Sequence, residues 1–139
     1  MQVLTDTQER CRTHVWHGYG RLSALPEAFE QAALARRLDA ARLLWCHVPN
    51  GGIRHLREAI KLKAAGVKAG VPDVLIFTAT PQAPRGVALE LKAQGKGYGD
   101  VEDVQREWLS SLASEGWATI LAFGCDDAVS QLQALGYRL

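Results

Sequence analysis

The fold is decided by the stretch Val71-Pro72-Asp73-Val74-Leu75-Ile76-Phe77 and by a second apolar run, Val87-Ala88-Leu89-Glu90-Leu91-Lys92. Both runs are rich in aliphatic and β-branched residues, and residues 78–86 between them contain the Pro and Gly typical of a turn. Together they predict an antiparallel β-hairpin. In such a hairpin the start of the first strand lies beside the end of the second, so we expect Asp73 near Glu90 and Lys92.

These three residues form a pattern that suits phosphodiester hydrolysis. Glu90 and Lys92 are two positions apart on one strand and therefore share a face. Two carboxylates held close together repel each other, and a hard cation such as Mg²⁺ or Mn²⁺ relieves that repulsion while keeping positions open for water and a phosphate oxygen. A neighbouring lysine can orient or help to deprotonate the attacking water. A surface salt bridge of Lys92 with one acid, while Asp73 caps a strand, explains these residues equally well.

Further segments follow in a specific order. They are Glu30-Gln31, His47-Val48-Pro49-Asn50-Gly51-Gly52, Gly66-Val67-Lys68-Ala69-Gly70-Val71-Pro72-Asp73, Glu90-Leu91-Lys92, and Gln105 with Trp108-Leu109. This ordered set resembles the VRR-NUC (virus-type replication-repair nuclease) family, a branch of the PD-(D/E)xK superfamily of restriction-endonuclease-like enzymes. The resemblance covers the chain from about Pro26 to its end, and the stretch from Gly66 to Asp73 is its most diagnostic part.

The resemblance implies a metal-dependent, structure-specific DNA endonuclease that uses Mg²⁺ or Mn²⁺. It assigns metal binding to Asp73, Glu90, the backbone carbonyl of Leu91 and Glu30, with Lys92 activating or positioning water and Gln105 supporting it. Stand-alone relatives of this size resemble homodimeric resolvases of four-way (Holliday) junctions, which implies a homodimer that acts on branched DNA. The alternatives are a flap, single-strand or duplex nuclease of the same fold, a catalytically silent DNA-binding module, and a protein-interaction subunit.

Two of these polar residues lie on apolar faces of predicted helices, Glu30 on a helix over 26–41 and Gln105 on a helix over 101–114. Burial of an unpaired carboxylate is costly, so Glu30 needs a metal or another cation if it faces the core. It could also face water in the first turn of its helix, where the helix dipole favours an acid. An amide on an apolar face needs partners too, and Gln105 could find them at Lys92 or at ordinary backbone groups.

Charge is distributed locally, because the formal net charge of the whole chain is only +1. Five basic residues stand against Glu58 alone in one segment: Arg54, Arg57, Lys61, Lys63 and Lys68. On a helix several of them share an outward face, which makes them candidates for contact with DNA phosphates or simply a solvated surface. The resemblance also places Asn50 near the substrate channel. We therefore expect DNA contacts from Asn50, Arg54, Arg57, Lys61 and Lys68.

The length of 139 residues suits one domain, and a hydrophobic content of 47% allows a proper core. Besides the two helices above, the pattern predicts helices over 53–65 and 126–135 and strands over 43–47 and 119–123. Strands that alternate with helices indicate a layered α/β domain. We expect a restriction-endonuclease-like mixed β-sheet with a central hairpin flanked by helices over residues 23–139, after an N-terminal arm over 1–22.

No apolar run of the chain approaches the length of a membrane span, and its first residues do not resemble a signal peptide. We therefore expect no membrane partner. A cytoplasmic protein, encoded by a bacterium or a phage, is the corresponding expectation.

Overall fold

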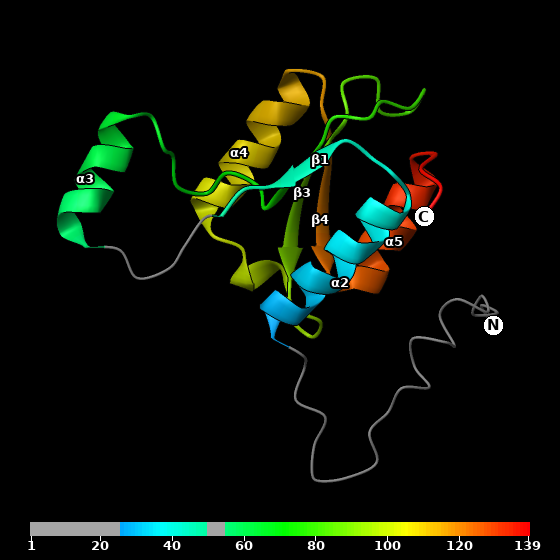
Figure 1. Cartoon of the computed structure of the whole chain (residues 1–139), viewed down its shortest axis with the longest axis horizontal. Helices are drawn as coiled ribbons and strands as arrows, with labels where there is room; N and C mark the ends of the chain where they lie inside the picture. The colour runs from blue at the N-terminus through cyan, green and yellow to red at the C-terminus, as the bar shows by residue number, and fades with distance from the viewer. Residues whose placement is uncertain (1–25, 50–54) are drawn as a thin grey trace, which may run out of the picture.

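The computed structural model describes residues 26–49 and 55–139 (Figure 1). The expected N-terminal arm over 1–22 lies outside these residues, as do Asn50 and Arg54. The elements are α2 (Glu27–Ala40), β1 (Trp45–His47), α3 (Leu56–Ala64), β2 (Val74–Ile76), β3 (Val87–Lys92), the 3₁₀ helix η1 (Tyr98–Asp100), α4 (Asp103–Ser114), β4 (Ala118–Phe123) and α5 (Cys125–Ala134). Within the described ranges no helix is both long and apolar enough to cross a membrane.

A mixed sheet with strand order β1-β2-β3-β4 organises the molecule. Strands β1, β2 and β3 pair antiparallel in sequence, whereas β3 pairs parallel with β4 through the crossover that contains α4. The expected hairpin is confirmed, with Val74 opposite Leu89 and Ile76 opposite Val87. Its first strand is shorter than the apolar run that predicted it, since Pro72 has no N–H to offer to a ladder. The mixed α/β fold is therefore as the sequence predicts.

Helices cover both faces of this sheet. Helices α2 and α5 pack against each other and on the sheet, and α4 packs on β3 and β4 from the other side (Figure 1). The buried core joins Leu34 and Leu38 of α2 to Leu89 and Leu91 of β3 and to Leu132 of α5. Because side chains alternate along a strand, the burial of Leu89 and Leu91 in this core directs Glu90 to the opposite face.

Helix α3 stands apart from the sheet (Figure 1). It ends at Ala64 and is followed by Gly66, whose φ of +99° suits the left-handed cap, and the N–H of Val67 donates to the carbonyl of Leu62 at 2.9 Å. None of its residues is buried, and Leu56 and Ile60 are 76% and 59% exposed. The sequence predicts an amphipathic helix here correctly, but the apolar stripe of this helix faces outward in the described part of the chain.

Candidate active site

The site lies where the hairpin ends, because the register brings Asp73 opposite Glu90. Val74 pairs with Leu89, so the next residue outward on each strand faces the other. The Asp73 carboxylate accepts the backbone N–H of Leu91 through Oδ2 at 2.8 Å. Its backbone carbonyl accepts the N–H of Val48, the residue that follows β1, at 2.7 Å. Asp73 is thus held from both neighbouring strands, and its carboxylate has one defined position.

Glu90 is a buried acid whose two oxygens are treated differently. Its side chain is 1% exposed. Oε1 lies 3.2 Å from Nζ of Lys92 and accepts Nε2–H of Gln105 at 2.5 Å. Oε2 is also buried, yet no hydrogen-bond partner reaches it among the described residues. A buried carboxylate oxygen without a donor is costly, so this atom marks a position that the fold itself does not satisfy.

The electrostatics of the pair follow from burial. Burial, followed by the nearby charge of Asp73, raises the pKa of Glu90 from 4.5 to about 7, against the lowering effect of Lys92. Burial likewise raises the pKa of Asp73, although the hydrogen bond from Leu91 and the charge of Lys92 oppose it. Because both carboxyl groups are harder to ionise than usual, a cation placed between them would be bound favourably.

Gln105 connects helix α4 to the acidic pair. Its Oε1 accepts the N–H of Glu102 at the start of the helix at 2.9 Å, and this leaves Nε2 to donate to Glu90. The expectation that this amide needs polar partners is met by Glu90 and the helix terminus. Its amide orientation follows from the hydrogen bonds, since Oε1 cannot donate.

A glycine fixes the distance of α4 from the hairpin. Gly70 has a φ of +79°, and a Cβ built there would lie 2.7 Å from a methyl group of Val104 on α4. Beside it, the indole Nε1 of Trp108 donates to the carbonyl of Ala69 at 3.0 Å. The loop that leads to Asp73 therefore docks on the helix that carries Gln105. This contact gives a physical reason for two glycines in the Gly66–Asp73 stretch, one as a helix cap and the other as a docking surface.

Glu30 is buried but serves a different element. Its side chain is 8% exposed, and Oε2 accepts the N–H of Cys125, the first residue of α5, at 2.7 Å. The residue at the N-cap of α5 is Gly124, which has no side chain to supply that oxygen. The sequence predicts correctly that Glu30 faces inward. The carboxylate of Glu30, for which we expected a role in metal binding, therefore already caps helix α5.

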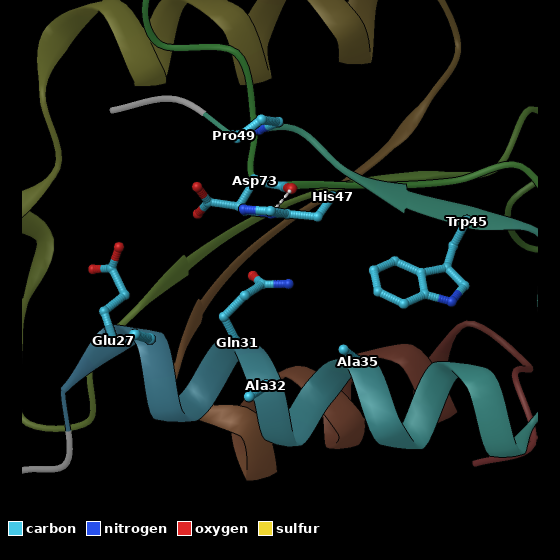
Figure 2. Close-up of a pocket in the computed structure, with 9 residues that line it drawn as sticks. Glu27, Gln31, Ala32, Ala35, Trp45, His47, Pro49 and Asp73 are labelled. Carbon is cyan, nitrogen blue, oxygen red and sulfur yellow. Dashed lines mark hydrogen bonds between the residues drawn. The ribbon is translucent and has the colours of Figure 1, made fainter. Parts of the chain in front are cut away.

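Glu27 is the acid of α2 that faces the site. It is exposed, it lines a pocket together with Asp73, and its charge contributes to the raised pKa of Glu90 (Figure 2). Helical periodicity does not point to Glu27, because the apolar stripe contains the buried Glu30 one turn later. The available signal was its place in the first turn of the helix.

The expected basic surface is only partly described. Arg57, Lys61 and Lys68 are exposed on α3 and on the segment that follows it. Because α3 stands apart from the sheet, these cations are not gathered around the acidic pair (Figure 1).

A metal ion at this site would need ligands besides acidic side chains. Among residues 26–49 and 55–139, no group of three or more His, Cys, Asp or Glu side chains is arranged to hold a metal. The pair Asp73 and Glu90 nevertheless fits a hard divalent cation, because the unpaired Oε2 and both raised pKa values call for positive charge. Mg²⁺ commonly uses one or two carboxylates and keeps several waters, so such a pair is sufficient.

Comparison with known proteins identifies the family. The family model for the VRR-NUC domain matches residues 25–124, a range that includes Asp73, Glu90, Lys92 and Gln105. The chain belongs to the VRR-NUC family. A solved structure described as a "VRR_NUC domain protein" is 28% identical, with a TM-score of 0.64 over 82% of this chain and 90% of that one. No curated protein matches the chain. A VRR-NUC domain implies a nuclease-type function in DNA processing, and nucleases of this kind generally use divalent metals.

Proposed function

We propose that this VRR-NUC protein is a Mg²⁺- or Mn²⁺-dependent, structure-specific DNA endonuclease of the bacterial or phage-host cytoplasm. More specifically, we propose a homodimeric four-way (Holliday) junction resolvase. The single observation that carries the nuclease assignment is the buried Oε2 of Glu90, which no donor from residues 26–49 or 55–139 reaches, beside the fixed carboxylate of Asp73.

Asp73, Glu90 and the backbone carbonyl of Leu91 would hold the metal. The N–H of Leu91 donates to Asp73, and the N–H and C=O of one strand residue point to the same side of the strand, so this carbonyl lies on the side of Asp73. When bound, the ion would neutralise charge on the phosphate and lower the pKa of a water. We assign the accompanying acid of α2 to Glu27 in preference to Glu30, whose carboxylate caps α5.

Lys92 and Gln105 would prepare the site for the attacking water. The Lys92 side chain is 12% exposed and its Nζ lies 3.2 Å from Oε1 of Glu90, so it can donate both to Glu90 and to a water or phosphate oxygen at the site. Gln105 keeps Oε1 of Glu90 in place and thereby directs Oε2 away from α4. The proposed roles are water positioning for Lys92 and carboxylate positioning for Gln105.

DNA contacts are proposed for the basic residues of α3 and its flanks. The exposed Arg57, Lys61 and Lys68, together with Asn50 and Arg54, would contact phosphates. The dimer and the junction preference rest on the resemblance to stand-alone relatives, because two sites related by a two-fold axis can nick opposed strands.

Cleavage assays test the proposal directly. Four-way junctions, flaps, linear duplexes and single strands are incubated with the protein and Mg²⁺ or Mn²⁺, beside an Asp73→Ala variant. Glu107→Ala serves as the control, since Glu107 is an exposed acid on α4. We expect the parent and the control to cut junctions, and Asp73→Ala to cut nothing.

Other outcomes of these assays would support one of the alternative functions. An Asp73→Ala variant that cuts like the parent refutes the metal site, and a parent that binds DNA without cutting any substrate supports the silent binding module. Preferred cleavage of flaps supports the flap nuclease. A monomer by light scattering that cuts junctions no better than duplexes removes the resolvase assignment.

A further inference from the structure

A groove runs along the N-terminal half of α2 from Asp73 to Trp45 (Figure 2). It has a volume of about 480 Å³, and its walls are one side of α2 and the strand β1 with the residues that follow it. One end of this groove is therefore the carboxylate to which we assign the metal. The other end is an aromatic side chain with no part in the mechanism proposed above.

The two walls suit a flat ligand. On α2 the lining residues Ala28, Ala32 and Ala35 recur at helical spacing and keep that wall low. On β1, Trp45 and His47 are two residues apart, which places them on one face about 7 Å from each other. Small residues opposite the two rings leave space for a planar group, which can stack on one ring and pack against the other.

Hydrogen bonds fix the two rings. Nε1 of Trp45 donates to Oδ1 of Asp39 at 2.8 Å. Nδ1 of His47 lies 2.8 Å from the carbonyl oxygen of Asp73. A carbonyl can only accept, so Nδ1 carries the proton of this hydrogen bond. Both rings are thus oriented before any ligand arrives, which reduces the entropy lost on binding.

Gln31 supplies a polar group in the middle of the groove. Its amide projects from α2 into the space between Asp73 and Trp45 (Figure 2). In the described part of the chain no hydrogen bond to this amide is found, although it is half-buried. An amide offers both donors and an acceptor, which is what the edge of a nucleobase requires.

We propose that this groove binds the base of an unpaired nucleotide next to the scissile phosphate. The base would stack on Trp45 and pack against His47, and Gln31 would bond its edge. The inference rests on the proposed nuclease function, because the phosphate is placed by the metal at Asp73. A groove of this size admits a single nucleotide and excludes a duplex, so the base must first leave its stack. The preferred substrates would therefore have an unpaired nucleotide at the cut, as flaps do and as a four-way junction does once a pair at its branch point opens.

The test compares the affinity of the protein for two DNAs that differ only in the presence of one base. Fluorescence anisotropy in Ca²⁺ measures the affinity for a branched DNA with one unpaired nucleotide at the cut, and for the same DNA with an abasic site there. We expect the parent to prefer the base by about tenfold, in line with the usual strength of stacking on an aromatic ring. In Ala32→Leu and Trp45→Ala the ratio should approach one, and Trp45→Phe should restore part of it. Ala40→Leu, on an exposed position of α2 outside the groove, should keep the ratio of the parent.

The outcomes separate this inference from the proposed function. Equal affinity of the parent for both DNAs, or a ratio unchanged in Ala32→Leu, overturns the groove assignment even if the parent cuts DNA with Mn²⁺. A base preference that depends on Trp45 in a protein that cuts no DNA supports the groove and refutes the nuclease. A free deoxynucleoside monophosphate that competes as well as the DNA overturns the assignment to the substrate strand.

Discussion

Two buried glutamates of this molecule, Glu30 and Glu90, have opposite surroundings. Glu30 is 8% exposed and Glu90 is 1% exposed. Glu30 accepts the first N–H of α5, so the fold itself uses its charge. Glu90 keeps one oxygen without a partner among the described residues, and its pKa is raised to about 7. Burial alone therefore does not identify a catalytic acid, and the unsatisfied oxygen of Glu90 is the reason why we propose it, and not Glu30, as the metal ligand.

The largest expected effect comes from Glu90→Gln. The amide keeps the shape of the side chain but cannot balance a divalent cation, so we expect cleavage to fall about a thousandfold or more, roughly 4 kcal/mol of transition-state stabilisation. The metal-free variant should be at least as stable as the parent at pH 8, because a buried charge is removed. Single-turnover cleavage and urea unfolding in EDTA measure the two effects. Cleavage within tenfold of the parent would end the distinction between the two acids.

The next effect is a pH dependence of stability without metal. Because the pKa of Glu90 rises from 4.5 to about 7 on folding, the folded protein holds this proton more tightly than the unfolded chain. The resulting stabilisation is complete below pH 4.5 and is lost as the pH rises through about 7, a change of roughly 3 kcal/mol at most.

Urea unfolding in EDTA between pH 5 and 8 measures this loss. Glu90→Gln should show a smaller decline, and added Mg²⁺ should stabilise the parent more at pH 8 than at pH 6, since the metal needs the ionised acid. Parallel curves for the parent and for Glu90→Gln would show that Glu90 ionises normally.

A smaller effect is expected for Glu30→Ala. Loss of the side-chain acceptor for the N–H of Cys125 should lower the free energy of unfolding by about 1–2 kcal/mol. Metal-dependent cleavage should persist at a temperature where the variant is folded, and Glu107→Ala should change neither quantity. A variant with parental stability and no cleavage would instead return Glu30 to the metal site.

The smallest effect concerns Glu27→Gln. The charge of Glu27 contributes to the raised pKa of Glu90, so its removal should move the titration midpoint of Glu90 downward. Carbon NMR of the Glu90 carboxyl in the metal-free protein follows this midpoint directly. The exposed Glu58→Gln on α3 is the matched control, and a midpoint equal to that of the parent would remove Glu27 from the site.

Much of the fold could be predicted because it depends on local patterns. The two apolar runs around 78–86 predict the hairpin, and its register then places Asp73 opposite Glu90 without further information. The inward direction of Glu30 follows from helical periodicity. Its partner does not, since Cys125 is 95 residues away and only the packing of α2 on α5 brings them together. The role proposed for Glu27 could not be predicted from helical periodicity, because an exposed acid in the first turn of a helix is common.

For helix α3 the sequence predicts the helix but not the surroundings of its apolar face. An amphipathic pattern indicates that a helix has an apolar face, but it does not say what covers that face. Here the face that contains Leu56 and Ile60 is exposed in the described structure.

Gly70 lies so close to Val104 that one added carbon atom at position 70 would disturb the proposed active site. A methyl group at position 70 would meet both methyls and the main chain of Val104, at 2.7 to 3.0 Å, so rotation of one side chain could not make room for it. The helix would have to shift outward and would take Gln105 with it. An alanine at position 70 would thereby weaken the hydrogen bond from Gln105 to the carboxylate of Glu90, which position 70 does not contact.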